Sequence, residues 1–275
     1  MTNSAARTTK DGRFGFEAKG DPSMPALVFL HGVGGAARGW RAQLDAFGDR
    51  YFTVAWDMPG YGGSAALPVV SIKTLSDALH DFLQQIGAQN ICLVGHSIGG
   101  MIVQQYLVDH PHGATSVVLA QTSPAFGRAD GDFQKQFIDA RIGPLDRGET
   151  MASMAPGMVR DLIGDNPDPA GVALALDCMS SVKPETYRAS MMALLGFDLR
   201  ANLKNIAVPT MLLSGTRDNN SPAPMVKKTA TFIPGSVYTE LEGIGHLPNL
   251  ENPAVFKAAI DAFLQGLPAI SGAAS

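Results

Sequence analysis

Gly95-His96-Ser97-Ile98-Gly99-Gly100 is the stretch of the chain that decides the expected fold. It lies where an apolar run, residues 90–94, gives way to a helical pattern over residues 101–110. When a chain turns from strand to helix within one residue, that residue is strained and its side chain stands exposed at the end of a sheet. Glycines two positions before and after it relieve the crowding. The pattern predicts Ser97 as a nucleophile; the alternative is a tight turn without chemistry.

A base must accept the proton of such a serine. His246 is the best candidate, because it lies in a glycine-framed loop, residues 243–248, between a predicted strand over residues 237–241 and a helix opened by Asn252-Pro253. A loop histidine can reach a neighbouring strand end, whereas the alternative is a surface histidine. We expect the sheet to turn His96 away from the nucleophile. The remaining histidines are expected to be solvated, to cap helices or to belong to turns: His31, His80, His110 and His112.

The imidazole needs a carboxylate that orients it and stabilises its charged form. Asp218 follows an apolar strand, residues 209–215, and precedes a proline-rich helix start, residues 221–224. A position just after a strand end suits this role. The alternative is an aspartate that only caps a helix or a turn.

Backbone N–H groups must hold the oxyanion of an acyl-transfer reaction. An apolar strand over residues 27–30 runs into the glycine-rich loop 31–35, which can turn its N–H groups inward. We expect Val33 to provide one donor, with Gly34 as the alternative. Ile98, directly after the nucleophile and at the start of its helix, is expected to provide the other.

Taken together, these motifs resemble the α/β-hydrolase superfamily over nearly the whole chain. The resemblance rests on five stretches: His31-Gly32, residues 57–64, the Ser97 hexapeptide, residues 215–218 and residues 245–253. It implies a mostly parallel sheet flanked by helices with an inserted helical cap, and a triad in the chain order Ser97, Asp218, His246. The chain looks most similar to the branch that contains 3-oxoadipate enol-lactonases and small-molecule esterases.

The resemblance implies hydrolysis of a small-molecule ester or lactone, without a cofactor, through an acyl-enzyme on Ser97. Dehalogenases and epoxide hydrolases of the superfamily carry Asp at this position, so alkyl-enzyme chemistry is not expected. One alternative is carbon–carbon hydrolysis of a vinylogous diketone from ring cleavage. Those enzymes usually have Asn before the serine and a proline in the oxyanion loop, where this chain has His96 and no proline between His31 and Trp40. The other alternative is a non-catalytic small-ligand receptor.

Residues 124–200 interrupt the alternation of predicted strands and helices. No strand is expected there, and helical patterns are broken at residues 143–144, 156–157 and 166–169. The sequence therefore predicts a helical cap at 124–200 inserted into a core domain at 1–123 and 201–275. Strands of the core are expected at 27–30, 52–56, 91–94, 116–120, 210–213 and 237–241, after an opening hairpin at 13–18.

The predicted cap should determine specificity. Six of the twelve methionines fall in it and suit an adaptable apolar cavity: Met151, Met154, Met158, Met179, Met191 and Met192. It also holds six arginines: Arg128, Arg141, Arg147, Arg160, Arg188 and Arg200. Arg188 is preferred as a clamp for a substrate carboxylate, because it lies on the best-defined cap helix, which Pro184 opens.

Composition excludes several classes of function. The chain has 275 residues, 45% of them hydrophobic, and a net charge of −4 without a basic run, so we expect no nucleic-acid or membrane partner. The start shows no leader pattern, which predicts a cytoplasmic protein. No metal-ligand spacing or phosphate-binding loop is present, so no metal or cofactor is expected. Whether copies form a homo-oligomer stays open.

Four side chains are expected to be structural. Asp57, which precedes a glycine-rich turn, should bond nearby backbone N–H groups; the alternative is a direct role in the chemistry. Trp40 should pack the first helix; the alternative is a side chain that lines the pocket. Cys92 and Cys178 should be reduced and buried rather than joined in a disulfide.

Overall fold

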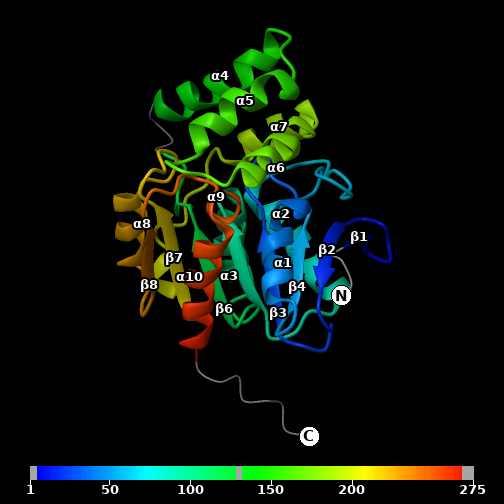
Figure 1. Cartoon of the computed structure of the whole chain (residues 1–275), viewed down its shortest axis with the longest axis vertical. Coiled ribbons are helices and arrows are strands. Elements are labelled where there is room, and N and C mark those ends of the chain that lie inside the picture. Colours follow the sequence, from blue (N-terminus) through cyan, green and yellow to red (C-terminus); the bar gives the residue numbers. More distant parts are fainter. Residues whose placement is uncertain (1–4, 128–131, 268–275) are drawn as a thin grey trace, which may run out of the picture.

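A central sheet organises the molecule. The computed structural model describes residues 5–127 and 132–267, and within these ranges the sheet has eight strands in the order β1-β2-β4-β3-β5-β6-β7-β8 (Figure 1). Neighbouring strands from β4 to β8 pair in parallel, whereas β1 and β2 pair antiparallel at one edge. The strands are β1 (Ala5–Thr8), β2 (Gly15–Lys19), β3 (Ala26–Leu30), β4 (Phe52–Trp56), β5 (Cys92–His96), β6 (Ser116–Ala120), β7 (Thr210–Gly215) and β8 (Val237–Leu241). The predicted fold class is confirmed.

The apolar runs of the sequence form the inner strands because both faces of the sheet are covered. Every residue of β3, β4, β5 and β6 is buried. Such continuous apolar strands are typical of parallel sheets between helix layers. The predicted hairpin at 13–18 is wrong in extent: β2 pairs with β1, which lies before residue 13. The polar sequence AART gave no strand signal, since an edge strand needs no apolar face.

Two helix layers cover the sheet. On one face, Trp40, Phe47 and Phe256 join a core cluster with residues of β3 and β5, and on the other face α2, α3 and α8 bury their apolar sides. The helices outside the insertion are η1 (Ala37–Trp40), α1 (Arg41–Phe47), α2 (Ile72–Ile86), α3 (Ile98–Asp109), η2 (Leu203–Asn205), α8 (Ala223–Ala230), α9 (Pro248–Glu251) and α10 (Pro253–Gln265). Trp40 is buried and stacks on Phe29 with ring centroids 5.0 Å apart, which confirms its packing role.

Between β6 and β7 the chain forms a helical insertion that stands above one end of the sheet (Figure 1). Its helices are α4 (Asp132–Asp146), α5 (Met151–Leu162), α6 (Pro169–Ser180) and α7 (Pro184–Ala193). Two expected interruptions are wrong, because Pro144 lies inside α4 and Pro156 inside α5. A proline inside a helix has no N–H and therefore leaves one backbone hydrogen bond unmade. In α5, the packing of the buried neighbours Met154, Ala155 and Val159 offsets that loss.

No helix within the described ranges has the length and the apolar character that a crossing of a membrane requires.

Candidate active site

Ser97 occupies the sharp turn between β5 and α3. Its backbone angles are φ 54° and ψ −119°, in the left-handed region that non-glycine residues rarely adopt. Two hydrogen bonds hold this strained residue: its N–H donates to the Ala120 carbonyl at 3.0 Å, and the Thr122 hydroxyl donates to its carbonyl at 2.8 Å. The strain is thus maintained by β6 and the segment after it, which is the arrangement expected of a positioned nucleophile.

The glycines beside Ser97 are required by close backbone approach. A Cβ atom on Gly95 would lie 2.6 Å from the Gly99 carbonyl oxygen. One on Gly99 would lie 2.5 Å from the carbonyl oxygen of Leu30 in β3. The turn therefore packs against itself and against the neighbouring strand, and neither site tolerates a side chain.

His246 and Asp218 are joined by a buried hydrogen bond. His246 Nδ1 lies 2.8 Å from Asp218 Oδ2, and Asp218 Oδ1 accepts the N–H groups of Asn220 and Ser221 at 2.8 and 3.0 Å. Burial alone would raise the pKa of Asp218, but the His246 charge, its hydrogen bond and the two N–H donors lower it below the ordinary value. Asp218 therefore stays ionised and accepts the Nδ1 proton, which leaves Nε2 of His246 free to act as a base.

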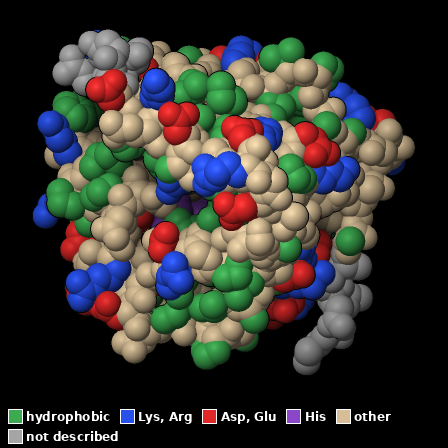
Figure 2. Space-filling view, turned by 90° about the horizontal axis from the view of Figure 1, so that it is seen from above, with side chains coloured by type: hydrophobic (Ala, Val, Ile, Leu, Met, Phe, Trp, Pro, Cys, Tyr) green, Lys and Arg blue, Asp and Glu red, His purple; other side chains and the backbone are tan. Residues whose placement is uncertain are grey.

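One cavity brings Ser97 and His246 together. Its volume is about 380 Å³, within the usual size of small-ligand sites, and side chains of the insertion form its far wall. Seen from above, a histidine side chain is visible in a recess of the surface (Figure 2). Among the described residues no hydrogen bond joins Ser97 to His246. Catalytic hydrogen bonds of this kind are often long before a substrate is bound.

The loop that carries His246 is held by a carboxylate to which the sequence analysis gave no role. Glu251 is buried in α9, and its Oε2 accepts the N–H groups of Gly164 and Gly245 at 2.7 and 2.9 Å. Its Oε1 accepts the N–H of Leu247 at 2.9 Å. Glu251 therefore bonds backbone on both sides of His246 and ties the loop to the end of α5. The sequence around it, Asn249-Leu250-Glu251-Asn252, carries no pattern that signals this role.

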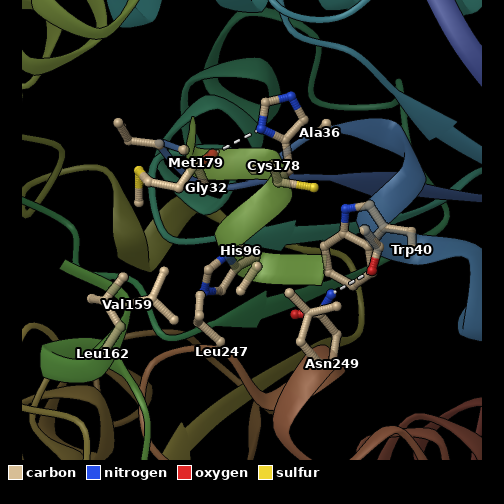
Figure 3. Close-up of a pocket in the computed structure, with 17 residues that line it drawn as sticks. Gly32, Ala36, Trp40, His96, Val159, Leu162, Cys178, Met179, Leu247 and Asn249 are labelled. Carbon is tan, nitrogen blue, oxygen red and sulfur yellow. Dashed lines mark hydrogen bonds between the residues drawn. The ribbon is translucent and has the colours of Figure 1, made fainter. Parts of the chain in front are cut away.

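The expectation that His96 is turned away from the site is wrong. His96 Nε2 donates to the His246 carbonyl at 2.6 Å, and the two rings lie 5.0 Å apart. Burial, together with the charge of His246, lowers the pKa of His96 to about 3, so its ring is neutral. His96 also lines a second cavity of about 40 Å³, where it lies beside Leu247 (Figure 3), and Met179 lines the same cavity. Because these three residues line both cavities, the small one adjoins the large one.

Two other histidines, both partly exposed, pack against each other, and one of them, His110, is the C-cap residue of α3, as the expectation of a capping histidine allowed. The rings of His80 and His110 stack with centroids 4.0 Å apart at an interplanar angle of 6°. Helices α2 and α3 pack side by side, which brings the end of α3 against the face of α2. This pair lies away from the residues that line the described cavities.

The expected oxyanion loop is braced from both sides. His31 Nδ1 donates to the Gly32 carbonyl at 2.8 Å while its Nε2 accepts the Met58 N–H at 3.1 Å. Asp57 accepts the N–H groups of Ala37 and Gly63 at 2.7 and 3.2 Å, so the predicted bonding of Asp57 to backbone is confirmed. These contacts fix the start and the end of the loop relative to β4.

Val33 is the one of the two candidate donors in the loop that lines the large cavity. Burial raises the pKa of the nearby Tyr61 to about 12, and the Tyr61 hydroxyl donates to Ser190 Oγ of α7 at 3.0 Å. Ile98 is the first residue of α3, where helical N–H groups lack partners within the helix.

The preference for Arg188 as the cap arginine of the site is wrong. Arg188 forms an ion pair with Asp146 at 2.6 Å and is not among the residues that line the cavity. Arg141 of α4 lines it instead. The sequence could not distinguish them, because the inward face of a cap helix is set by tertiary packing. Arg128 lies outside the described residues.

Half of the predicted cap methionines line the cavity: Met158, Met179 and Met191. Met151 and Met154 are buried within the insertion, and Met192 is 50% exposed. Met101 and Met225, from α3 and α8, also line the cavity. The wall is therefore rich in flexible apolar side chains, though the core supplies part of it.

Cys92 and Cys178 are free and buried, as expected. Within residues 5–127 and 132–267, no group of three or more His, Cys, Asp or Glu side chains is arranged to hold a metal ion.

A comparison with protein families assigns the chain to one of them. The model of the alpha/beta hydrolase family matches residues 27–259, which include every candidate site residue named above. The chain belongs to the alpha/beta hydrolase family. Its eight-stranded sheet and the helices on both faces agree with this membership.

Relatives of this alpha/beta hydrolase are similar over most of their length. 3-Oxoadipate enol-lactonase 2 of Acinetobacter baylyi is 25% identical over 264 residues, covering 94% of this chain and 95% of the relative. 2-Succinyl-6-hydroxy-2,4-cyclohexadiene-1-carboxylate synthase of Escherichia coli is 28% identical, covering 90% and 96%. The crystal structure of a hydrolase from Pseudomonas aeruginosa is 25% identical with a TM-score of 0.83, covering 95% and 98%. The chain therefore resembles both a lactonase and a synthase.

Proposed function

We propose that this hydrolase cleaves a small-molecule ester or lactone, without a cofactor, through an acyl-enzyme on Ser97. The observation that carries the proposal is the convergence of a strained Ser97 and the Asp218-bonded His246 on one cavity. The lactonase relative supports the choice of substrate class. The carbon–carbon alternative would use the same three groups but needs ketonisation of a dienol first. Because one relative is a synthase rather than a lactonase, a ring-cleavage dienoate is also tested as a substrate.

The reaction starts when His246 Nε2 takes the Ser97 proton and Oγ attacks the carbonyl carbon. The N–H groups of Val33 and Ile98 hold the oxyanion. His246 then gives the proton to the leaving oxygen, which departs as an alcohol or, from a lactone, stays attached as the hydroxyl of the acyl chain. Water enters, and its oxygen attacks the acyl carbon while His246 takes one of its protons. The bond from the acyl carbon to Ser97 Oγ then breaks as His246 returns the proton to Oγ, which gives the acid and free Ser97.

Turnover of a simple 4-nitrophenyl ester by wild type and by Ser97→Ala tests the proposal. Loss of the nucleophile should lower kcat by a factor on the order of 10⁴ to 10⁶, with an unchanged melting temperature. A variant that keeps more than about a tenth of the wild-type rate would refute the role of Ser97. A receptor on this fold would show no turnover in the wild type, and turnover of a ring-cleavage dienoate alone would favour the carbon–carbon alternative.

A further inference from the structure

Arg141 is a positively charged side chain that lines the otherwise largely apolar cavity. It projects from α4 into the space that Ser97 and His246 share. Its guanidinium carbon lies 3.8 Å from the centroid of the Phe137 ring, and its nearest hydrogen-bond partner is Asn220 Oδ1 at 3.5 Å. Stacking on an aromatic ring uses the face of the guanidinium and leaves the N–H groups at its edge available.

No carboxylate neutralises Arg141 within ion-pair distance among residues 5–127 and 132–267. Arg188 and Arg217, by contrast, pair with Asp146 and Asp165 at 2.6 and 2.8 Å. Asp161 lines the same cavity, but its side chain is 76% exposed and lies 3.8 Å from Arg160. Burial lowers the pKa of Arg141 and so penalises its charge, and the charges of Tyr187 and Asp161, which act in the opposite direction, offset this only in part.

A second polar group in this cavity lacks a partner. Tyr187 of α7 is only 1% exposed, and its hydroxyl has no hydrogen bond within the described part of the chain. Burial raises its pKa to about 12, while the charge of Arg141 acts in the opposite direction. Both side chains line the cavity, and their helices α4 and α7 pack against each other. Buried hydroxyls are almost always bonded, and each one left unpaired destabilises the fold. A ligand that accepts hydrogen bonds would satisfy both groups at once.

We propose that Arg141 and Tyr187 form a carboxylate subsite, and that the substrate is an ester or lactone bearing a free carboxylate. This inference rests on the proposed function and specifies its substrate class. The planar guanidinium edge matches a carboxylate with two parallel hydrogen bonds, and the phenol adds a third donor. Positive and negative side chains mix on the outer face above the cavity (Figure 2), so the preference for an anion comes from the cavity rather than from the surface.

Two esters of equal chain length separate this subsite from simple esterase activity. The mono-4-nitrophenyl ester of pimelate carries the carboxylate, and 4-nitrophenyl heptanoate lacks it. We expect Arg141→Ala to lower the ratio of kcat/KM for the pimelate ester over the heptanoate ester about 10- to 100-fold. Tyr187→Phe, which keeps the ring, should lower the same ratio about 3- to 10-fold. Arg188→Ala removes a cap arginine outside the cavity and should leave the ratio unchanged.

Binding of a pimelate monoester to Ser97→Ala provides a readout without turnover. Titration calorimetry should show binding of monomethyl pimelate that weakens about 10-fold or more on adding Arg141→Ala, and binding of neutral methyl heptanoate that changes less. An unchanged ester ratio in both Arg141→Ala and Tyr187→Phe, with Ser97-dependent turnover intact, would refute the subsite and leave the proposed function standing. If neither ester is turned over, the proposed function fails, while Arg141-dependent binding of monomethyl pimelate would still support the subsite.

Discussion

Polar side chains in the loops at the end of the sheet differ in their hydrogen bonding from those in the cavity wall that the helical insertion forms. At the sheet end, Glu251 accepts three N–H groups and Asp57 two, and Asp218 bonds His246 as well as backbone. In the insertion, Arg141 and Tyr187 line the cavity, and within the described ranges the guanidinium has a 3.5 Å contact with Asn220 Oδ1 and the Tyr187 hydroxyl has no hydrogen bond. Groups that move protons must be preorganised by the protein itself, whereas groups that select a ligand can leave their hydrogen bonds to it.

The largest loss of turnover is expected when a carboxylate at the end of the sheet is replaced. Asp218→Asn keeps the size of the side chain but no longer favours the His246 tautomer with Nδ1 protonated, so turnover of a neutral ester should fall by a factor on the order of 10⁴. Asp57→Asn should instead act on the melting temperature, because Asp57 contacts backbone N–H groups of loops. Rates and melting curves of both variants check this. The opposite pattern would assign the acid to Asp57.

A smaller effect is expected where the carboxylate holds the loop rather than the proton. Glu251→Gln replaces one acceptor oxygen with an amide NH₂ that faces a backbone N–H. We expect a loss of about 1–3 kcal/mol in the free energy of unfolding and a fall in kcat of about 10-fold. Urea unfolding and steady-state kinetics measure both. Glu149→Gln, at an exposed site, is the matched control. A Glu251 variant as stable and as active as that control would refute the bracing of the loop.

The smallest effect is expected on the stability of the protein at acid pH. It depends on His96, whose ring is held at the end of the sheet by its hydrogen bond to the His246 carbonyl. Its folded-state pKa of about 3 lies below the ordinary value of 6.5, so the unfolded chain binds the proton first. The stability that neutral His96 contributes is complete above pH 6.5 and is lost as the pH falls toward 3. The slope is on the order of 1 kcal/mol per pH unit.

His96→Gln keeps an N–H donor for the His246 carbonyl and has no titrating ring. Its melting temperature should therefore fall less steeply than that of wild type between neutral pH and pH 4. A part of the slope should persist, because burial also lowers the pKa of His31. His112→Gln serves as the control, and equal slopes in all three proteins would contradict the assignment.

Sequence reasoning was effective for the features that depend on short-range backbone constraints. The glycines around Ser97, the strand ends before Asp218 and His246, and the positions of the parallel strands along the chain all follow from local patterns. What it missed depends on tertiary packing. The inward face of α4 made Arg141 the cavity arginine, and the approach of the segment after α5 to α9 gave Glu251 its bond to the Gly164 N–H. The polar edge strand β1 carries no apolar pattern at all.

The central claim is that Ser97 forms a covalent acyl-enzyme in this cavity. The most direct measurement uses an alkyl 4-nitrophenyl phosphonate, whose phosphorus is attacked by an activated serine Oγ with release of 4-nitrophenolate. Intact-mass spectrometry and peptide mapping of the reacted wild type should show a single adduct, located on Ser97, with a matching release of nitrophenolate. Ser97→Ala should show none. An adduct on another residue, or an unlabelled Ser97 in protein that still turns over esters, would contradict the account.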